Sequence, residues 1–212
     1  IVPLLLQSKV QGKKEQLQKV YVNQEQSFIE ENKKKGKIVA LFSGLGFDSH
    51  RIIDNCKIYT ENMNIPDSID MISGLMIGGI CVDKDKRFMA NSDGDILIHS
   101  IIDSLAPTIL KKDIGELFPD STNMYKNYPS EKLLKHMIEK IEGENVKYRI
   151  HSLDCVIVID SVKITNFKDQ IIQNLQRFFP QTSIVLKGKR TEGSLSSDSG
   201  YCWVVSLIEY FK

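Results

Sequence analysis

The sequence carries almost no net charge and contains no long apolar run, and both absences narrow its possible functions. Its 212 residues include 28 Lys and Arg against 27 Asp and Glu, a formal net charge of +1. A nearly neutral chain gives no reason to expect nucleic acid or an anionic membrane as a generic partner. No apolar run approaches the roughly 18 residues that a membrane-spanning helix needs. We therefore expect no nucleic-acid partner and no membrane.

Cysteines are few and widely separated. The four of them, Cys56, Cys81, Cys155 and Cys202, form no CxxC pair, and three lie in apolar surroundings typical of strands. We therefore expect buried reduced thiols rather than disulfides or a thiolate metal site.

Composition divides the chain into two parts. With 42% hydrophobic residues, the length suits one globular domain with a full core and an appendage. After a short apolar start, residues 1–36 are mostly Lys, Gln, Glu and Asn, which predicts a solvated, partly helical or disordered extension. The alternative is the remainder of an organelle-targeting region. Residues 37–212 are predicted to form the folded domain.

Apolar runs typical of strands recur along the second part. One run is split by Gly78 and Gly79, a tight-turn signal that predicts a small β-hairpin. Segments with helical spacing separate the runs, and this alternation predicts an α+β fold, a mixed β-sheet with helices on one face. The expected strands lie at 37–42, 75–82, 153–159, 184–186 and 203–208, and the expected helices follow Ser92 and span 130–143 and 166–179.

Asp48 and His50 suggest the start of a divalent-metal site. They follow the strand predicted at 37–42, and if the chain stays extended their side chains leave the same face of the strand. A carboxylate oxygen and an imidazole nitrogen would then converge. Gly44 and Gly46 would allow a ligand to approach the backbone closely. Two ligands do not close a site, and a surface pair is the plain alternative.

His99 is the candidate third ligand. The helix after Ser92 would begin at Ser92 or Asp93 and be disturbed or ended by Pro107. On it, His99 shares a face with Asp95, and a surface carboxylate–histidine pair is the simpler interpretation. Together with the first two ligands, however, His99 gives one oxygen and two nitrogens. Three protein ligands with one open position are the pattern of a catalytic zinc.

Four motifs occur in an order that resembles a known family. They are GLGFDSH at 44–50, LMIGGICV at 75–82, NSDGDILIH at 91–99 and DIGELFPDS at 113–121. In this order and at about this spacing, the sequence resembles the 2-C-methyl-D-erythritol 2,4-cyclodiphosphate synthases of the non-mevalonate isoprenoid pathway. The similarity runs from about Lys37 to the C-terminus and is strongest between residues 75 and 120.

The resemblance implies a metal-assisted, intramolecular phosphoryl transfer that releases CMP from a cytidine diphosphate substrate. It implies Zn²⁺ on Asp48, His50 and His99, and a second metal, Mg²⁺ or Mn²⁺, on Glu192. Thr191 and Glu192 would be the catalytic pair beside the phosphates.

The resemblance also implies a set of substrate-binding residues. Asp113 and Gly115 would hold the ribose, the segment 160–164 would read cytosine largely through its backbone, and a basic loop would face the phosphates. The full set is Asn91, Ser92, Asp95, Asp113, Gly115, Phe118, Asp120, Asp160, Ser161, Val162, Lys163, Ile164, Gly188, Lys189 and Arg190. Two residues depart from the usual pattern, because Asn91 replaces a histidine and Arg190 a threonine.

The family assembles as a homotrimer with active sites between subunits, so the resemblance implies the same here. It also suggests a plastid, apicoplast-like stroma as the location, with the bacterial cytoplasm as the alternative. Two other functions stay open: a zinc-dependent phosphoesterase that uses the three ligands to activate water, and a non-catalytic oligomer stabilised by zinc.

Overall fold

The computed structural model of the protein describes residues 38–54, 74–119, 125, 128–144 and 147–211. The chain divides into two units, Ala40–Tyr210 and a second made of Ile1–Val39 with Phe211–Lys212. The extension predicted at 1–36, Cys56 and Asp120 lie outside the described residues.

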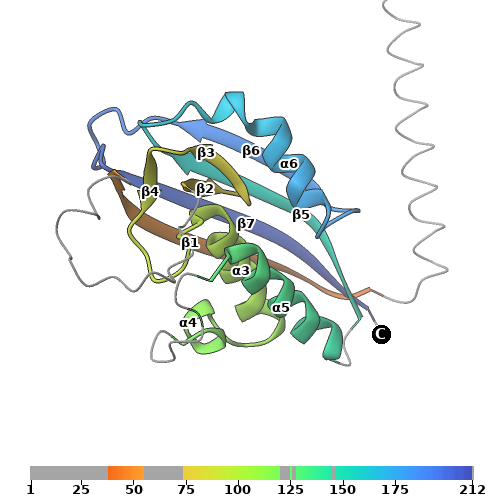
Figure 1. Ribbon diagram of the computed structural model, residues 1–212. Coiled ribbons are helices and arrows are strands. Elements are labelled where there is room, and N and C mark those ends of the chain that lie inside the picture. Colours follow the sequence, from red (N-terminus) through yellow and green to blue (C-terminus); the bar gives the residue numbers. More distant parts are fainter. Residues whose placement is uncertain (1–37, 55–73, 120–124, 126–127, 145–146, 212) are drawn as a thin grey trace, which may run out of the picture. The chain divides into compact units, whose positions relative to one another are not determined.

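A five-stranded sheet in the order β4-β1-β7-β5-β6 is the framework of the larger unit (Figure 1). β1 (Ile38–Asp54) pairs antiparallel with β4 (Lys86–Phe88), whereas β5 (Lys147–Val158) pairs parallel with β6 (Ser183–Lys189). The sheet is therefore mixed, as predicted. β7 (Ser199–Phe211) lies between β1 and β5.

The predicted small hairpin is also present. β2 (Leu75–Ile77) and β3 (Ile80–Asp83) pair antiparallel around Gly78 and Gly79, and both glycines have positive φ. Glycine adopts this backbone region without the penalty that other residues incur, which explains why the turn falls here.

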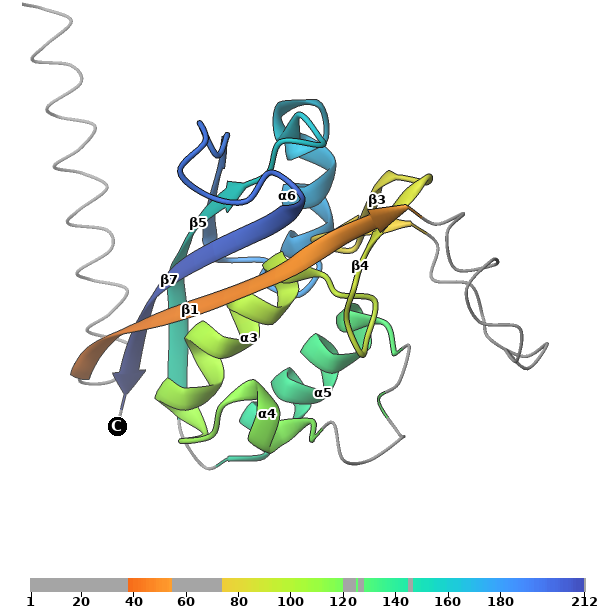
Figure 2. The ribbon, with the colours of Figure 1, turned by 90° about the vertical axis from the view of Figure 1, so that its left-hand side faces the viewer.

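The helices cover one face of the sheet (Figure 2). They are α3 (Ile96–Ile109), α4 (Ile114–Leu117), α5 (Ser130–Gly143) and α6 (Lys168–Gln176), the last preceded by the short 3₁₀ helix η3 (Ile164–Asn166). None of the helices in the described part of the chain is long and apolar enough to cross a membrane.

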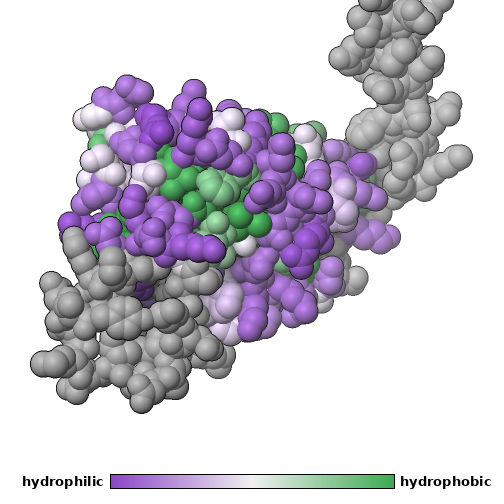
Figure 3. Space-filling view, turned by 45° about the horizontal axis from the view of Figure 1, so that its top comes forward, coloured by the Kyte–Doolittle hydropathy of each residue, from purple (hydrophilic) through white to green (hydrophobic). Residues whose placement is uncertain are grey.

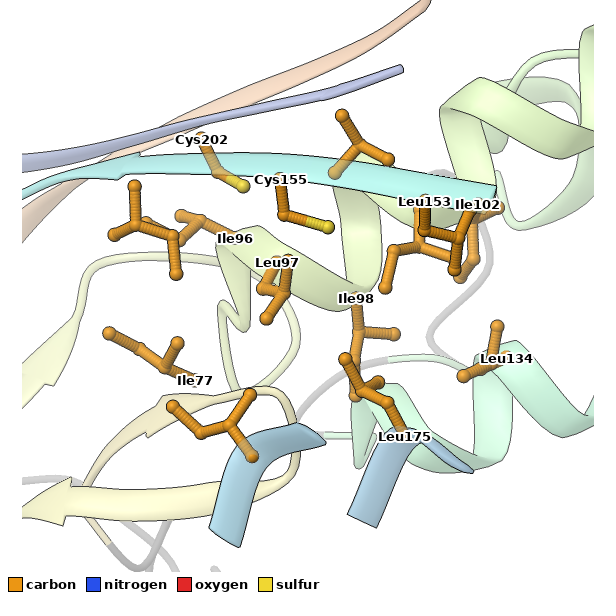
Figure 4. Packing of buried hydrophobic residues seen from close by; sticks show 14 of the residues in the cluster. Ile77, Ile96, Leu97, Ile98, Ile102, Leu134, Leu153, Cys155, Leu175 and Cys202 are labelled. Atoms are coloured by element: carbon orange, nitrogen blue, oxygen red, sulfur yellow. The ribbon is translucent and has the colours of Figure 1, made fainter. Parts of the chain in front are cut away.

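The hydrophobic core fills the space between the sheet and these helices. Figure 4 shows side chains from β5 and β7 meeting side chains from α3, α5, α6 and the hairpin. They include Ile77, Ile98, Ile102, Leu134, Leu153, Cys155, Leu175 and Cys202, all at 0% exposure. Cys155 and Cys202 are buried free thiols, as predicted, and Cys81 is a half-buried thiol.

On the side that carries β3 and α6, a hydrophobic patch is framed by hydrophilic side chains (Figure 3).

Gly44 and Gly46 bring α3 into direct backbone contact with β1. A Cβ atom on Gly44 would lie 1.7 Å from the Ser104 carbonyl oxygen, and one on Gly46 would lie 1.9 Å from that of Ser100. The space that we assigned to an approaching ligand is therefore filled by the helix. This contact sets the distance between the strand that carries Asp48 and the helix that carries His99.

Three details differ from the predictions. The N-cap of α3 is Asp95, not Ser92 or Asp93, because its carboxylate accepts hydrogen bonds from the Leu97 and Ile98 amides. Pro107 does not end α3, which continues to Ile109, because a missing N–H in the last turn removes a single helical bond. The short, polar strand β4 was not predicted, since its three residues show no clear pattern.

Candidate active site

β1 places Asp48 and His50 on one face, as predicted from their spacing. The strand stays extended through both residues, so side chains two apart emerge together. His50 Nε2 lies 3.1 Å from Asp48 Oδ2. It is nevertheless buried, and no described group forms a hydrogen bond with it.

His99 reaches the same point from α3. Its Nδ1 lies 2.9 Å from Asp48 Oδ2, and its ring stands edge-on to the His50 ring with centroids 5.7 Å apart. One ligand atom from each of Asp48, His50 and His99 falls within 4.8 Å of the others. This is the one such trio of His, Cys, Asp or Glu side chains in the described part of the chain, and the predicted grouping is confirmed.

Within the trio, the Asp48 carboxylate and the two imidazoles shift one another's pKa values. Burial alone would raise the pKa of Asp48, but the imidazoles of His50 and His99 outweigh it and hold that pKa well below its usual range. Burial would likewise lower the pKa of His99, yet the Asp48 carboxylate dominates and raises it. The carboxylate is therefore ionised at any pH at which the protein would operate.

The trio fits a divalent cation. A buried imidazole nitrogen without a hydrogen-bond partner is costly unless something binds it, and His50 Nε2 is such an atom. One carboxylate and two imidazoles form a donor set that suits zinc and its borderline neighbours. The geometry thus supports a divalent-metal site without identifying the metal.

Asp95, one of the residues predicted to bind substrate, is fully buried, and its carboxylate oxygens accept hydrogen bonds from backbone amides. One oxygen accepts from Gly78 N at 2.9 Å and from the first turn of α3, and the other accepts from Gly79 N at 2.7 Å. Burial and the nearby Asp93 carboxylate raise the pKa of Asp95 to about 6, against the effect of these N–H groups. The side chain ties the hairpin turn to the start of α3.

The first two residues of the NSDGD segment differ in exposure. Asn91 is exposed, whereas Ser92 is buried. The Ser92 hydroxyl accepts from Gly94 N at 3.1 Å and lies 3.1 Å from His99 Nε2. Ser92 therefore contacts one member of the trio directly.

The segment expected to hold the ribose begins α4. Asp113 and Gly115 are both exposed, and Asp113 is the N-cap, with a capping box formed by Glu116. Asp103, one turn after His99 on α3, accepts from Ile114 N at 3.1 Å and so links this segment to the helix that carries His99. Phe118 is buried against Tyr125, with ring centroids 5.3 Å apart.

The predicted site residues between positions 160 and 192, here called the late group, include several at the end of β6. Thr191 is buried, and both its N–H and its hydroxyl donate to the Asp160 carboxylate, at 3.1 and 2.5 Å. The pKa of Asp160 is lowered, chiefly by these hydrogen bonds. Glu192 is exposed with a positive φ of 48°, in a turn that Ser194 N closes onto the Thr191 carbonyl.

The remaining late residues divide by exposure. The exposed ones present three cations and a glycine to solvent, and one of these cations, Arg190, also donates to the Asp160 carbonyl. Val162 and Ile164 are buried and Ser161 is half-buried. The exposed members of this set are Lys163, Gly188, Lys189 and Arg190.

Ser130 is the site residue that sequence reasoning missed. Its hydroxyl lies 2.9 Å from His99 Nε2, and it also donates to Asp93. In the sequence Ser130 showed only as the first residue of a predicted helix, 31 positions from the histidine. No local pattern could have paired the two.

Comparison with known proteins agrees with this geometry. The YgbB family matches residues 41–207. A 2-C-methyl-D-erythritol 2,4-cyclodiphosphate synthase from Aquifex aeolicus is 33% identical over 167 residues, which cover 78% of this chain and 95% of that protein. Its counterpart from Treponema denticola is 33% identical over 153 residues, which cover 71% and 83%. The solved IspF of Plasmodium falciparum in complex with CDP is similar with a TM-score of 0.60 at 25% identity, covering 83% of this chain and all of that one. The chain therefore belongs to the YgbB family, and 2-C-methyl-D-erythritol 2,4-cyclodiphosphate synthases are its relatives.

Proposed function

We propose that this protein converts 4-diphosphocytidyl-2-C-methyl-D-erythritol 2-phosphate into 2-C-methyl-D-erythritol 2,4-cyclodiphosphate and CMP. An oxygen of the 2-phosphate attacks the β-phosphorus, and the bond from that phosphorus to the CMP oxygen breaks, so CMP leaves with the electron pair. The observation that carries the proposal is the Asp48, His50 and His99 trio in a chain of this family.

The attack needs no protein nucleophile, because both reacting groups belong to one substrate. The protein's task is to hold the two phosphates in line and to neutralise their charge. Lys163, Lys189 and Arg190 are exposed cations suited to phosphate oxygens. Asp113 and the nearby Gly115 offer a carboxylate and an unobstructed backbone to the ribose diol.

Two divalent cations would complete the charge balance. We infer Zn²⁺ at Asp48, His50 and His99, and Mg²⁺ or Mn²⁺ held by Glu192 together with substrate phosphates, since Mg²⁺ is often bound by one or two carboxylates plus phosphate. When bound, such ions polarise phosphoryl oxygens and stabilise the leaving group. Thr191 would act by fixing the turn that presents Glu192, because its own hydroxyl is engaged by Asp160.

The two halves of the site are proposed to come from neighbouring subunits of a homotrimer. The zinc half lies on β1, and the Glu192 half follows β6, three strand positions away in the sheet. At about 4.8 Å between strands, this places them on the order of 14 Å apart. A cyclic trimer would bring the zinc half of one chain to the Glu192 half of the next, three times over.

The outer face of the sheet supports such an assembly. Side chains that alternate with Gly44, Gly46 and Ser206 point away from α3, and they are exposed and, apart from Ser43, apolar. Leu45 is 67% exposed and Val205 47% exposed. The row comprises Leu41, Leu45, Phe47, Val205 and Leu207. Burying it between subunits would remove a contiguous apolar surface from water.

Phosphorus NMR of the reaction mixture tests the function. With the proposed substrate and both metals, we expect two coupled phosphorus signals of a cyclic diphosphate together with free CMP. A zinc-dependent phosphoesterase would release CMP without the cyclic product, and a non-catalytic oligomer would leave the substrate unchanged. His50→Ala is the matched inactive variant, and a cyclic product formed by it at the wild-type rate would contradict the assignment.

Localisation in a plastid, apicoplast-like stroma stays a prediction, with the bacterial cytoplasm as the alternative. The segment on which it depends, residues 1–36, lies outside the described residues. Fusing this segment to a fluorescent protein in an apicoplast-bearing cell is the test. Plastid fluorescence would support the prediction, and diffuse cytoplasmic fluorescence would contradict it.

A further inference from the structure

His99 is held through both ring nitrogens, and the two sides of the ring meet different chemistry. Nδ1 faces Asp48 Oδ2 at 2.9 Å, on the side of the proposed metal. Nε2 faces two hydroxyls, Ser130 Oγ at 2.9 Å and Ser92 Oγ at 3.1 Å. Which nitrogen carries the proton in the metal-bound protein therefore depends on what these hydroxyls can accept.

The hydroxyl proton of Ser130 is already committed elsewhere. Ser130 Oγ donates to Asp93 Oδ1 in a very short contact, and Ser130 N donates to Asp93 Oδ2 at 3.0 Å. An ionised carboxylate can only accept, so the single hydroxyl proton points at Asp93. The Ser130 oxygen is left as an acceptor for His99, which requires a hydrogen on Nε2.

Ser92 does not fix this direction by itself. Its hydroxyl oxygen accepts from Gly94 N, but no described acceptor other than Nε2 takes its proton. A rotating hydroxyl can donate to a bare Nε2 or accept from a protonated one. Ser130 is thus the decisive contact. It is fully buried at the start of α5, which also shields the hydrogen bond from water.

We propose that Asp93 and Ser130 are positioning residues that hold His99 in the Nε2–H tautomer, so that the Nδ1 lone pair is directed at the metal. The carboxylate orients the hydroxyl, the hydroxyl orients the ring, and the ring presents one defined nitrogen beside Asp48 and His50. The inference rests on the proposed metal site, and it assigns to the start of α5 a role in metal affinity.

The first test needs no mutation. Protein labelled with ¹⁵N at histidine and loaded with zinc should give long-range ¹H–¹⁵N spectra in which His99 carries its hydrogen on Nε2 and binds metal through Nδ1. Metal bound through Nε2 would overturn the proposal. If zinc shifts none of the His50 and His99 signals, the proposed metal site is wrong, and the relay from Asp93 through Ser130 to His99 has no metal to serve.

The second test removes the relay. In Ser130→Ala, the zinc dissociation constant measured by chelator competition should rise about 10- to 100-fold, the usual effect of losing a residue that orients a metal ligand. Asp93→Asn should weaken zinc in the same direction, because its amide can donate to Ser130 and reverse the hydrogen bond. Ser104→Ala is the control: it removes another fully buried hydroxyl, on α3 itself, which donates to the Ile101 carbonyl.

The control separates positioning from general loss of stability. We expect Ser104→Ala to destabilise the fold while its zinc dissociation constant stays within twofold of wild type. If Ser130→Ala and Asp93→Asn bind zinc as tightly as Ser104→Ala, with unchanged imidazole signals, the positioning role is refuted. If the variants fail to fold, the wild-type spectrum still decides the tautomer.

Discussion

Gly46→Ala is the change that most directly tests how the fold builds the metal trio. The added Cβ would lie 1.9 Å from the Ser100 carbonyl oxygen and 2.7 Å from Ser104 N, both in the backbone of α3. A backbone atom cannot rotate away as a side chain can. An ordinary carbon–oxygen contact is about 3.4 Å, so β1 and α3 must separate locally by about 1.5 Å.

That separation falls where Asp48 and His99 of the candidate metal trio lie. Asp48 is two residues after Gly46 on β1, and His99 is the neighbour of Ser100 on α3. The 2.9 Å distance between Asp48 Oδ2 and His99 Nδ1 would grow by a similar amount. Overpacking of this kind costs about 1–3 kcal/mol of unfolding free energy, and a 1 Å displacement of catalytic groups can cost on the order of 100-fold in rate. We expect both losses, with zinc affinity reduced by at least tenfold.

Denaturant unfolding, chelator competition and turnover, measured on the same preparation, check this expectation. Gly143→Ala is the matched substitution, since a Cβ there meets nothing within 4 Å at the end of α5. Ile157→Val in the core should cost about 0.5–1.5 kcal/mol without touching the trio. A Gly46→Ala protein that binds zinc as tightly as Ile157→Val would refute the reasoning.

Three further predictions concern the same centre. His99→Ala should lose tightly bound zinc and most turnover while keeping its circular dichroism spectrum; stoichiometric zinc after dialysis would contradict the ligand assignment. In the metal-free protein, the lowered pKa of Asp48 adds stability that is present above the ordinary pKa of 3.8 and is lost as the pH falls through the folded value. The raised pKa of His99 adds stability that is present below the ordinary pKa of 6.5 and is lost as the pH rises through the folded value. The denaturation midpoint should therefore be highest between about pH 4 and 6.5, and the Asp48→Asn variant should lack this maximum; identical pH profiles would count against the pair. Finally, inactive Asp48→Ala and Glu192→Ala subunits refolded together at equal ratio should regain about a quarter of wild-type activity if assembly is random and sites are shared. Mixed trimers without activity would place both halves in one chain.

Local periodicity was enough to predict much of this molecule. The spacing of Asp48 and His50 fixes their common face once the chain is extended, and helical spacing places His99 on α3. Gly78 and Gly79 mark the hairpin turn because their positive φ values suit glycine. In each case the signal and its consequence lie within a few residues of each other.

Contacts between distant segments could not be predicted in this way. Asp95 is the N-cap of α3 partly because its other partners are the Gly78 and Gly79 amides, 17 and 16 residues earlier. Gly46 looked like space for a ligand, because nothing local shows that the backbone of α3 fills that space. Ser130 is a similar case, since its relation to His99 exists only in the folded chain. Tertiary packing thus decides which of several locally similar polar residues caps the helix or contacts His99.

The NSDGD segment shows how this choice divides the work of the site. Asp95 holds the hairpin, Asp93 holds Ser130, and Ser92 contacts His99, so all three polar side chains are engaged inside the protein, including the two, Ser92 and Asp95, that were predicted to bind substrate. We therefore expect exposed residues such as Asp113 and Lys163 to make the direct contacts with the proposed substrate. Changes in the buried set should act through zinc affinity or stability, whereas changes in the exposed set should act through KM. Zinc affinity, stability and KM are measured separately. A buried residue whose substitution changes only KM, or an exposed residue whose substitution changes only zinc affinity, would therefore contradict this division.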